Sequence, residues 1–160
     1  MTELKPYQLA ADEGQAIWHL GALMRFKALG KDTGGRFWLA EQVSQKGYAS
    51  PLHRHTNEDE LFMVLDGELR VGVGETVYEL GAGGVAFAPR ALPHTFSVES
   101  DEAKFLVLST PAGFENWFIE TGMPYSGEAH PPMPETPPDF GRIVESLARY
   151  QVDVLGGPPD

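Results

Sequence analysis

The sequence predicts an all-β domain that ends in a short helical tail. Three observations lead to this fold class. Apolar and polar residues alternate in short runs, which is the period of a strand with one buried face. Turn residues separate these runs at spacings of roughly 8–12 residues, as in β-sandwiches and barrels. After about residue 110 the alternation stops, and prolines and helical spacings replace it.

The strand pattern extends from about residue 14 to residue 110. Its clearest alternating runs are 22–29, 36–43 and 68–73. Asp66-Gly67 lies between two such runs and predicts a hairpin, because glycine tolerates the positive φ of a type I′ turn. Further turn signals stand at 74–75 and 81–84.

Two helices are predicted in the tail. The first carries Phe114, Trp117 and Phe118 on one face and ends before Gly122. The second begins at 136–139, where Thr-Pro-Pro-Asp resembles a capping box with proline at the first helical position. The apolar residues after it have the spacing of an amphipathic helix: Phe140, Ile143, Val144 and Leu147.

A proline-rich segment separates these helices. Six of the thirteen prolines fall between Pro124 and Pro138, where the chain is expected neither to pair as a strand nor to continue a helix. Because little chain follows, we expect a strap across the barrel surface rather than a linker to a second domain. The predicted organisation is a barrel with N-terminal strands over 1–112, with the strap and the C-terminal helices packed on it over 113–160.

Composition limits the classes of partner. The chain has 12 Lys and Arg against 23 Asp and Glu, a net charge of −11, which disfavours nucleic acid and anionic membrane surfaces. It has no cysteine, which excludes disulfides and thiolate metal ligands. No apolar run approaches the ~20 residues of a membrane span, and the first residues lack the pattern of a secretory signal. We therefore expect a cytoplasmic protein whose partner is a small molecule, not nucleic acid or a membrane.

Three of the five histidines form a pattern with one carboxylate. His53 and His55 are two residues apart and share one face of an extended strand. Glu60 stands at an odd spacing from His55, on the opposite face unless the turn-like residues 56–59 reset the alternation. His94 belongs to a later strand. In a closed barrel these four side chains can converge on one interior point.

This set of side chains predicts a metal site. Imidazoles with one carboxylate suit a divalent transition metal (Fe, Ni, Mn, Co, Cu or Zn), whereas Ca and Mg prefer oxygen ligands. Four protein ligands on a six-coordinate ion leave two positions for water, substrate or O₂, which favours a catalytic site. Because histidine ligands must be neutral, metal affinity should fall as the pH drops below about 6.5.

Two segments resemble the motifs of a known family. The segment 47–67 resembles the first cupin motif at each fixed position: Gly, five residues, His-X-His, four residues, Glu, six residues, Gly. The segment 83–98 resembles the second motif in the spacing of Gly83, Pro89 and His94. It departs from that motif at Ala91, where the family usually has Gly, and at Val98, where it usually has Asn. Neither departure falls on a ligand position.

The resemblance implies a single cupin β-barrel, a small antiparallel jelly-roll or double-stranded β-helix. It implies a metal held by His53, His55, Glu60 and His94. More narrowly, 51–55, 110–115 and the aromatic helix after them are similar to the quercetin 2,3-dioxygenase-like cupins. We expect 160 residues to hold one such barrel rather than the two of a two-barrel quercetinase. Single cupins commonly pair, so the resemblance also implies a homodimer.

For function, the resemblance implies a metal-dependent dioxygenase that acts with O₂ on a small flavonol- or enol-like aromatic substrate. Glu60 would be a ligand and also the catalytic general base for the substrate hydroxyl. Two alternatives remain. The first is a metal-dependent isomerase, lyase or cyclase. The second is a non-catalytic metal-containing module that binds a small molecule, since a fold does not dictate a function.

The alternation also predicts a substrate pocket. Four apolar side chains share the inward faces of Glu60 and His94: Phe62, Val64, Phe96 and Val98. No Arg or Lys falls on these faces, because Arg54 alternates away and Arg90 lies in a loop. A phosphorylated sugar or 2-oxoglutarate would need a cationic anchor, so both are disfavoured.

The remaining polar residues are interpreted as structural. His19 and His130 match no motif and are expected to be structural or solvent-exposed. Glu58 and Asp59 are expected to form a solvated turn. The aromatic stripe at 114–118 is expected to pack on the barrel rather than to hold a cofactor.

Overall fold

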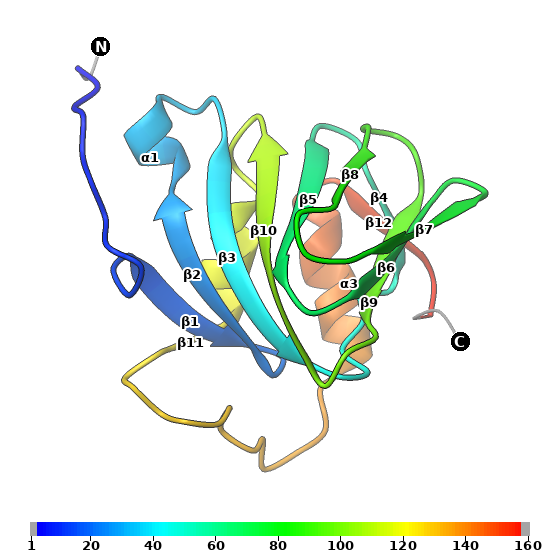
Figure 1. Cartoon of the computed structure of the whole chain (residues 1–160). Helices are drawn as coiled ribbons and strands as arrows, with labels where there is room; N and C mark the ends of the chain where they lie inside the picture. The colour runs from blue at the N-terminus through cyan, green and yellow to red at the C-terminus, as the bar shows by residue number, and fades with distance from the viewer. Residues whose placement is uncertain (1–2, 158–160) are drawn as a thin grey trace.

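Two antiparallel β-sheets stacked face to face form the body of the molecule in the computed structural model, which describes residues 3–157 (Figure 1). In spatial order the seven-stranded sheet contains β11 (Met123–Pro124), β1 (Gln15–His19), β2 (Ala22–Ala28), β3 (Trp38–Gln45), β10 (Glu102–Thr110), β5 (Asp59–Asp66) and β8 (Val85–Ala88). The five-stranded sheet contains β12 (Val152–Gly156), β4 (Leu52–His55), β9 (His94–Val98), β6 (Leu69–Val73) and β7 (Thr76–Leu80). The helices are α1 (Gly30–Thr33), α2 (Glu115–Thr121) and α3 (Phe140–Ala148). The predicted all-β jelly-roll with short helices is confirmed.

The hydrophobic core fills the space between the two sheets. Strands β2, β3 and β10 alternate buried with more exposed side chains along almost their whole length, as the period-two pattern predicts. Trp38 and Phe105 are completely buried. The four predicted pocket residues also face this space, with exposed fractions of 2% for Phe62, 0% for Val64, 7% for Phe96 and 2% for Val98. None of the described helices is long and apolar enough to cross a membrane.

One predicted hairpin is wrong. Asp66-Gly67 joins β5 to β6, but β5 pairs with β10 and β8, whereas β6 pairs with β7 and β9. The turn therefore carries the chain from one sheet to the other. Gly67 has φ +83°, and a Cβ there would clash with the carbonyl oxygen of Glu102. Local turn chemistry demands glycine here, while burial of both inner faces decides which strands pair.

Ala91, in the loop before β9, has a backbone conformation that usually requires glycine. Its φ is +67°, and its amide donates a 2.7 Å hydrogen bond to the carbonyl oxygen of His55. The second cupin motif usually has Gly at this position, and the structure supplies the reason. A left-handed conformation costs an L-residue about 1 kcal/mol or more.

We predict that Ala91→Gly raises the free energy of unfolding by about 1 kcal/mol, because the strain disappears and the exposed methyl group contributes little packing. Ala86→Gly on β8 is the matched control: Ala86 is buried in a regular strand, so this change should lower stability by about 1 kcal/mol. Urea unfolding at neutral pH measures both changes. A destabilised Ala91→Gly protein would contradict the assigned strain.

The strap, defined as residues 124–138, is mostly exposed and loops out beyond the sheets (Figure 1). Its start was expected not to pair as a strand, yet Met123–Pro124 forms β11 and pairs with β1. Proline is tolerated there because β11 is an edge strand, where the N–H that proline lacks would face solvent and is not needed for pairing. The strap contacts the barrel through Trp18, whose Nε1 donates a 3.2 Å hydrogen bond to Glu128 Oε2 and whose ring lies 5.7 Å from that of Tyr125.

The C-terminal segment contains both a helix and a strand. Helix α3 begins later than predicted, because its N-cap is Asp139, whose Oδ1 accepts a 3.2 Å hydrogen bond from the Arg142 amide. The sequence pattern predicts no strand after α3. The structure nevertheless places β12 beside β4, with Val152 opposite His55 and Val154 opposite His53. The end of the described chain thus supports the strand that carries two of the predicted metal ligands.

Candidate metal centre

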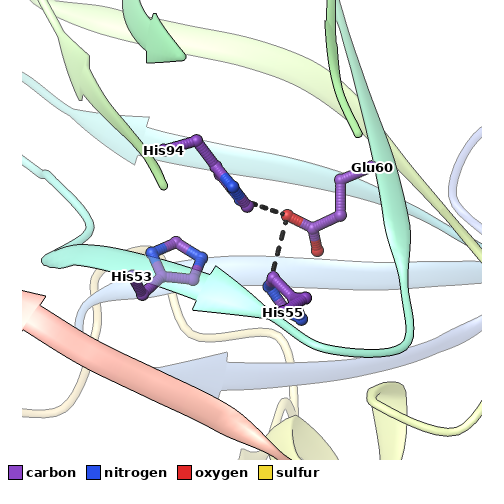
Figure 2. Close-up of side chains that lie close together, drawn as sticks. All are labelled: His53, His55, Glu60 and His94. Atoms are coloured by element: carbon purple, nitrogen blue, oxygen red, sulfur yellow. Dashed lines mark hydrogen bonds and ion pairs between the residues drawn. The ribbon is translucent and has the colours of Figure 1, made fainter. Parts of the chain in front are cut away.

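The four predicted ligands meet at one end of the barrel. His53 and His55 lie on β4, Glu60 on β5 and His94 on β9, and all four side chains point toward a common centre (Figure 2). One ligand atom from each lies within 4.8 Å of the others. His55, Glu60 and His94 are at most 5% exposed, and His53 is half-buried. The sequence prediction of this cluster is confirmed.

The turn between β4 and β5 explains how Glu60 reaches the cluster. Residues 56–58 leave the extended conformation, so the alternation restarts at Asp59. Glu60 then faces inward and its Oε2 lies 2.9 Å from His94 Nε2 and 3.6 Å from His55 Nε2. The register pairs His53 directly with His94 across β4 and β9, with ring centroids 4.3 Å apart.

Each imidazole has an oxygen acceptor at Nδ1. His53 Nδ1 donates to Pro51 O at 2.8 Å, His55 Nδ1 to Glu58 Oε2 at 3.1 Å and His94 Nδ1 to Leu92 O at 3.3 Å. When a metal binds, a proton on each Nδ1 makes Nε2 the ligand atom that faces the cluster. This is the pattern by which proteins orient histidine ligands for a metal. Without a metal, His94 Nε2 lies within hydrogen-bond distance of Glu60 Oε2, at 2.9 Å.

The residues present fit a metal ion. His55 Nε2 is completely buried and has no hydrogen-bond partner, which is rare unless a ligand accounts for it. Three imidazole nitrogens and a carboxylate oxygen are a donor set for a divalent transition metal. His53, His55, Glu60 and His94 would hold it, and the identity of the metal stays a prediction.

Burial and neighbouring charges shift the pKa values of the ligands in the metal-free protein. Burial, reinforced by His94, lowers the pKa of His53 to about 4. Burial also lowers the pKa of His55, but Glu60 and Glu58 outweigh it, so the pKa of His55 is raised above 6.5. Burial opposes ionisation of Glu60, but the attraction of His55 and His94 outweighs it and the pKa of Glu60 is lowered. These shifts favour an ionised Glu60 and a protonated His55.

We predict that metal binding releases protons at pH 6.5, and fewer as the pH rises, because the pKa of His55 is raised and this side chain must become neutral to bind the ion. The raised pKa of His55 stabilises the metal-free protein fully below about 6.5, and this contribution is lost as the pH rises through the raised value. The loaded protein keeps His55 neutral, so the stabilisation by metal should widen as the pH rises. Zn²⁺ titration calorimetry in buffers of different ionisation enthalpy measures the proton release. Release that stays constant from pH 6 to pH 9 would exclude His55 as a ligand.

Glu58 was expected in a solvated turn, and this prediction is wrong. Its side chain is buried, with an exposed fraction of 6%, and it accepts the hydrogen bond from His55 Nδ1. The turn that turns Glu60 inward also folds Glu58 under His55. The sequence signal for this contact was the spacing of three residues between His55 and Glu58. The same spacing is equally consistent with a solvent-exposed carboxylate in a polar turn.

We predict that Glu58→Ala weakens metal affinity by about 10–100-fold, the usual effect of removing the partner that orients a ligand. Asp59→Asn is the matched control: Asp59 forms an ion pair with Arg90, at 2.9 Å, on the outside of the site. Competition with a fluorescent Zn²⁺ chelator compares both variants with the wild type. Equal affinity of Glu58→Ala and the wild type would show that His55 keeps its orientation without Glu58.

The cations near the site face away from it. Arg54 pairs with Asp153 at 2.9 Å across β4 and β12, and Arg90 pairs with Asp59. The charge of each guanidinium group is therefore balanced by an aspartate at the surface. Neither arginine offers a cationic anchor inside the site, which agrees with the expectation that disfavours phosphorylated sugars and 2-oxoglutarate.

Aromatic side chains of α2 close one side of the site. Phe114, at the N-cap of α2, lies with its ring centroid 4.7 Å from that of His55. Trp117 and Phe118 extend this cluster to His19, whose Nε2 lies 2.9 Å from Thr121 Oγ1. His19 is thus a buried structural residue, and burial lowers its pKa to about 4. His130 is exposed in the strap, so both histidines behave as predicted.

Comparison with known proteins agrees with this site. Residues 40–110 match the family model described as a cupin domain, and this range includes all four ligands. The chain contains a cupin domain. The match extends from β3 to the end of β10, so the cupin motifs inferred from 47–67 and 83–98 are confirmed.

One curated relative is similar to almost the whole of this chain. Quercetin 2,3-dioxygenase from Bacillus subtilis (strain 168) is 28% identical over 146 residues, which are 91% of this chain and 43% of that protein. The chain thus spans less than half the length of this relative.

Solved structures confirm the fold of the cupin. A predicted oxalate decarboxylase from Thermotoga maritima superposes with a TM-score of 0.60 at 17% identity, covering 66% of this chain and 99% of that one. An RmlC-like cupin from Shewanella frigidimarina NCIMB 400 superposes with a TM-score of 0.59 at 18% identity, covering 69% and 96%. At these identities the likeness concerns the fold alone.

Proposed function

We propose that this cupin is a metal-dependent dioxygenase that acts on a small flavonol- or enol-like aromatic substrate. The observation that carries the proposal is the buried cluster of three histidines and one glutamate, with each Nε2 or carboxylate oxygen facing one centre. Similarity to quercetin 2,3-dioxygenase over 91% of the chain supports the choice of reaction.

The ligand residues have separate roles. His53, His55, His94 and Glu60 would hold a divalent metal, which would supply a Lewis acid for the substrate hydroxyl and a binding position for O₂. Glu60 accepts the hydroxyl proton at Oε2. Its lowered pKa keeps the carboxylate ionised at neutral pH, and it already sits within hydrogen-bond reach of the centre.

The surroundings of the site suit an aromatic substrate. Phe114 lies beside His55, and Phe62 lies beside His94 with ring centroids 6.2 Å apart. These rings exclude water and offer apolar contact to a planar ligand. Arg54 and Arg90 are paired at the surface and point away from the site, which favours an uncharged or phenolic substrate over a phosphate ester.

Oxygen uptake tests the proposal. The stripped protein is loaded in turn with Fe, Ni, Mn, Co, Cu or Zn and mixed with quercetin in an oxygen electrode chamber, with a panel of related flavonols in parallel. We expect one O₂ consumed per flavonol lost with at least one redox-capable metal. No uptake with any metal or flavonol would exclude the quercetinase version.

The same experiment separates the alternatives. Conversion of a substrate without O₂ consumption would favour an isomerase, lyase or cyclase. Binding of the flavonol without conversion, measured in parallel by its absorption shift, would favour a non-catalytic module. Metal analysis of protein purified without added metal identifies which ion to test first.

A further inference from the structure

Two buried hydrogen-bond donors near the metal ligands have no partner. Within residues 3–157, four completely buried side-chain polar atoms lack a hydrogen bond: His19 Nδ1, Trp38 Nε1, His55 Nε2 and Ser109 Oγ. The ligand cluster accounts for His55, and His19 lies in the aromatic cluster of α2. Trp38 and Ser109 remain, and native proteins rarely leave such groups unsatisfied without a reason.

Strand register places both donors in line with Glu60. Ser109 on β10 pairs directly with Glu60 on β5 and, on its other side, with Trp38 on β3. Directly opposed residues share a face of the sheet, with Cβ atoms roughly 4.5–5.5 Å apart. All three side chains are buried, with exposed fractions of 5% for Glu60 and 0% for Ser109 and Trp38. A row of three polar groups therefore runs from the metal ligand along the inner face of the seven-stranded sheet.

Aromatic rings border this row on the side of α2. Trp38 lies 5.8 Å from Phe118, Phe118 lies 5.1 Å from Phe114, and Phe114 lies 4.7 Å from His55, measured between ring centroids. The rings thus link the far end of the row back to the metal ligands. They provide apolar walls for a planar group, while the row supplies polar contacts.

The deeper part of the barrel differs. Phe62 lies 5.6 Å from Phe96, and Phe96 lies 5.4 Å from Phe105, so aromatic packing occupies that region. Val64 and Val98 are likewise buried in this core. These residues present no hydrogen-bonding group. The polar row, and not the deeper core, is the side of the site equipped to orient a ligand that has oxygen atoms.

We propose that Ser109 Oγ–H and Trp38 Nε1–H donate hydrogen bonds to an oxygen atom of the substrate, next to the oxygen that the metal holds. The indole N–H is only a donor, so the substrate atom must be an acceptor, such as a carbonyl oxygen adjacent to the metal-bound hydroxyl. This inference rests on the proposed function, since flavonols and enolised diketones carry an oxygen pair of this kind. The site would therefore select ligands that carry a hydroxyl group next to a carbonyl group on a planar ring.

Maltol, a small hydroxypyranone chelator, tests the donors without any turnover. Its adjacent hydroxyl and carbonyl oxygens bind Zn²⁺, and the carbonyl oxygen keeps a second lone pair for the two donors. Its affinity for Zn-loaded protein can be measured by calorimetry for the wild type, Ser109→Ala and Trp38→Phe. We expect each variant to keep its zinc and to bind maltol on the order of tenfold more weakly. Ser44→Ala is the control, because Ser44 is a buried serine elsewhere on β3 that accepts a hydrogen bond from Gln42.

Melting temperature separates a substrate donor from a structural one. Removal of an unpartnered hydroxyl should leave the melting temperature of Ser109→Ala unchanged or raise it, whereas Ser44→Ala should lower it because Gln42 loses its partner. A lower melting temperature for Ser109→Ala together with unchanged maltol affinity would overturn the proposal in favour of a structural water.

If Trp38→Phe does not fold, an NMR measurement on the wild-type protein tests the same donor. The indole N–H proton of Trp38 should shift downfield when maltol is added to Zn-loaded protein. No shift, no maltol binding by the wild type, or equal affinity of wild type and Ser109→Ala would each overturn the proposal. Oxygen uptake with quercetin is a separate measurement. If uptake is absent while maltol binding depends on Ser109, the flavonol reaction is excluded, but the role of Ser109 and Trp38 as hydrogen-bond donors to a ligand is supported.

Discussion

His94→Gln should lose the bound metal almost completely. The variant removes one of the three imidazoles, while its amide is still able to donate to Glu60 Oε2, which lies 2.9 Å from His94 Nε2. Because a ligand is lost rather than its orienting partner, the loss of affinity should exceed the ~10–100-fold expected for Glu58→Ala. Elemental analysis after loading should give about one ion per chain for the wild type and near none for the variant.

Thermal melts give a second measure of the same effect. A ligand at 100 times its Kd stabilises a protein by about 2.7 kcal/mol, or roughly 5–10 °C in a domain of this size. The loaded wild type should show this shift relative to the stripped protein, and His94→Gln should not. His130→Ala, in the exposed strap, is the control and should behave as the wild type. Retention of one tightly bound ion by His94→Gln would refute the ligand set.

Glu60→Gln should bind metal more weakly, and at saturating metal it should still lose turnover by roughly 10²–10⁴-fold, the usual contribution of a general base. Three imidazoles alone suffice to hold a catalytic ion, and an amide cannot accept the substrate proton. Flavonol affinity should change little, so the loss should appear in kcat. The measurement is initial oxygen uptake per metal-loaded chain, with whichever metal supports the wild-type reaction.

Glu115→Gln is the matched control for this variant. Glu115 is also a buried glutamate, but it lies on α2 and accepts hydrogen bonds from the amides of Gly30 and Gly113. Its replacement should lower the melting temperature and leave oxygen uptake per folded chain unchanged. Full turnover by a metal-loaded Glu60→Gln would exclude Glu60 as the base.

The ligands were predictable because their pattern is local. His53 and His55 share a face by the period of a strand, and the spacing from His55 to Glu60 and the later His94 completes a motif. The inward orientation of Phe62, Val64, Phe96 and Val98 follows from the same period and holds in the structure. In each case neighbours along the chain decide where the side chain points.

Features that depend on contacts between distant strands were not predictable. Asp66-Gly67 has the local chemistry of a hairpin, but its two strands pair with other partners in different sheets. Strand β12 has an unremarkable sequence and becomes a strand because β4 offers it an edge. The role of Ser109 emerges only when the register places it between Glu60 and Trp38.

The sequence by itself predicted the fold class and the four side chains that cluster, because these depend on short-range periodicity and on the spacing of a motif. With no cysteine in the chain, nitrogen and oxygen are the ligands that remain. The tertiary structure decided which groups surround them: Glu58 under His55, the rings of α2 beside it, and the donors beside Glu60. Those contacts join residues from different elements, and only packing of the two sheets and the helices brings them together.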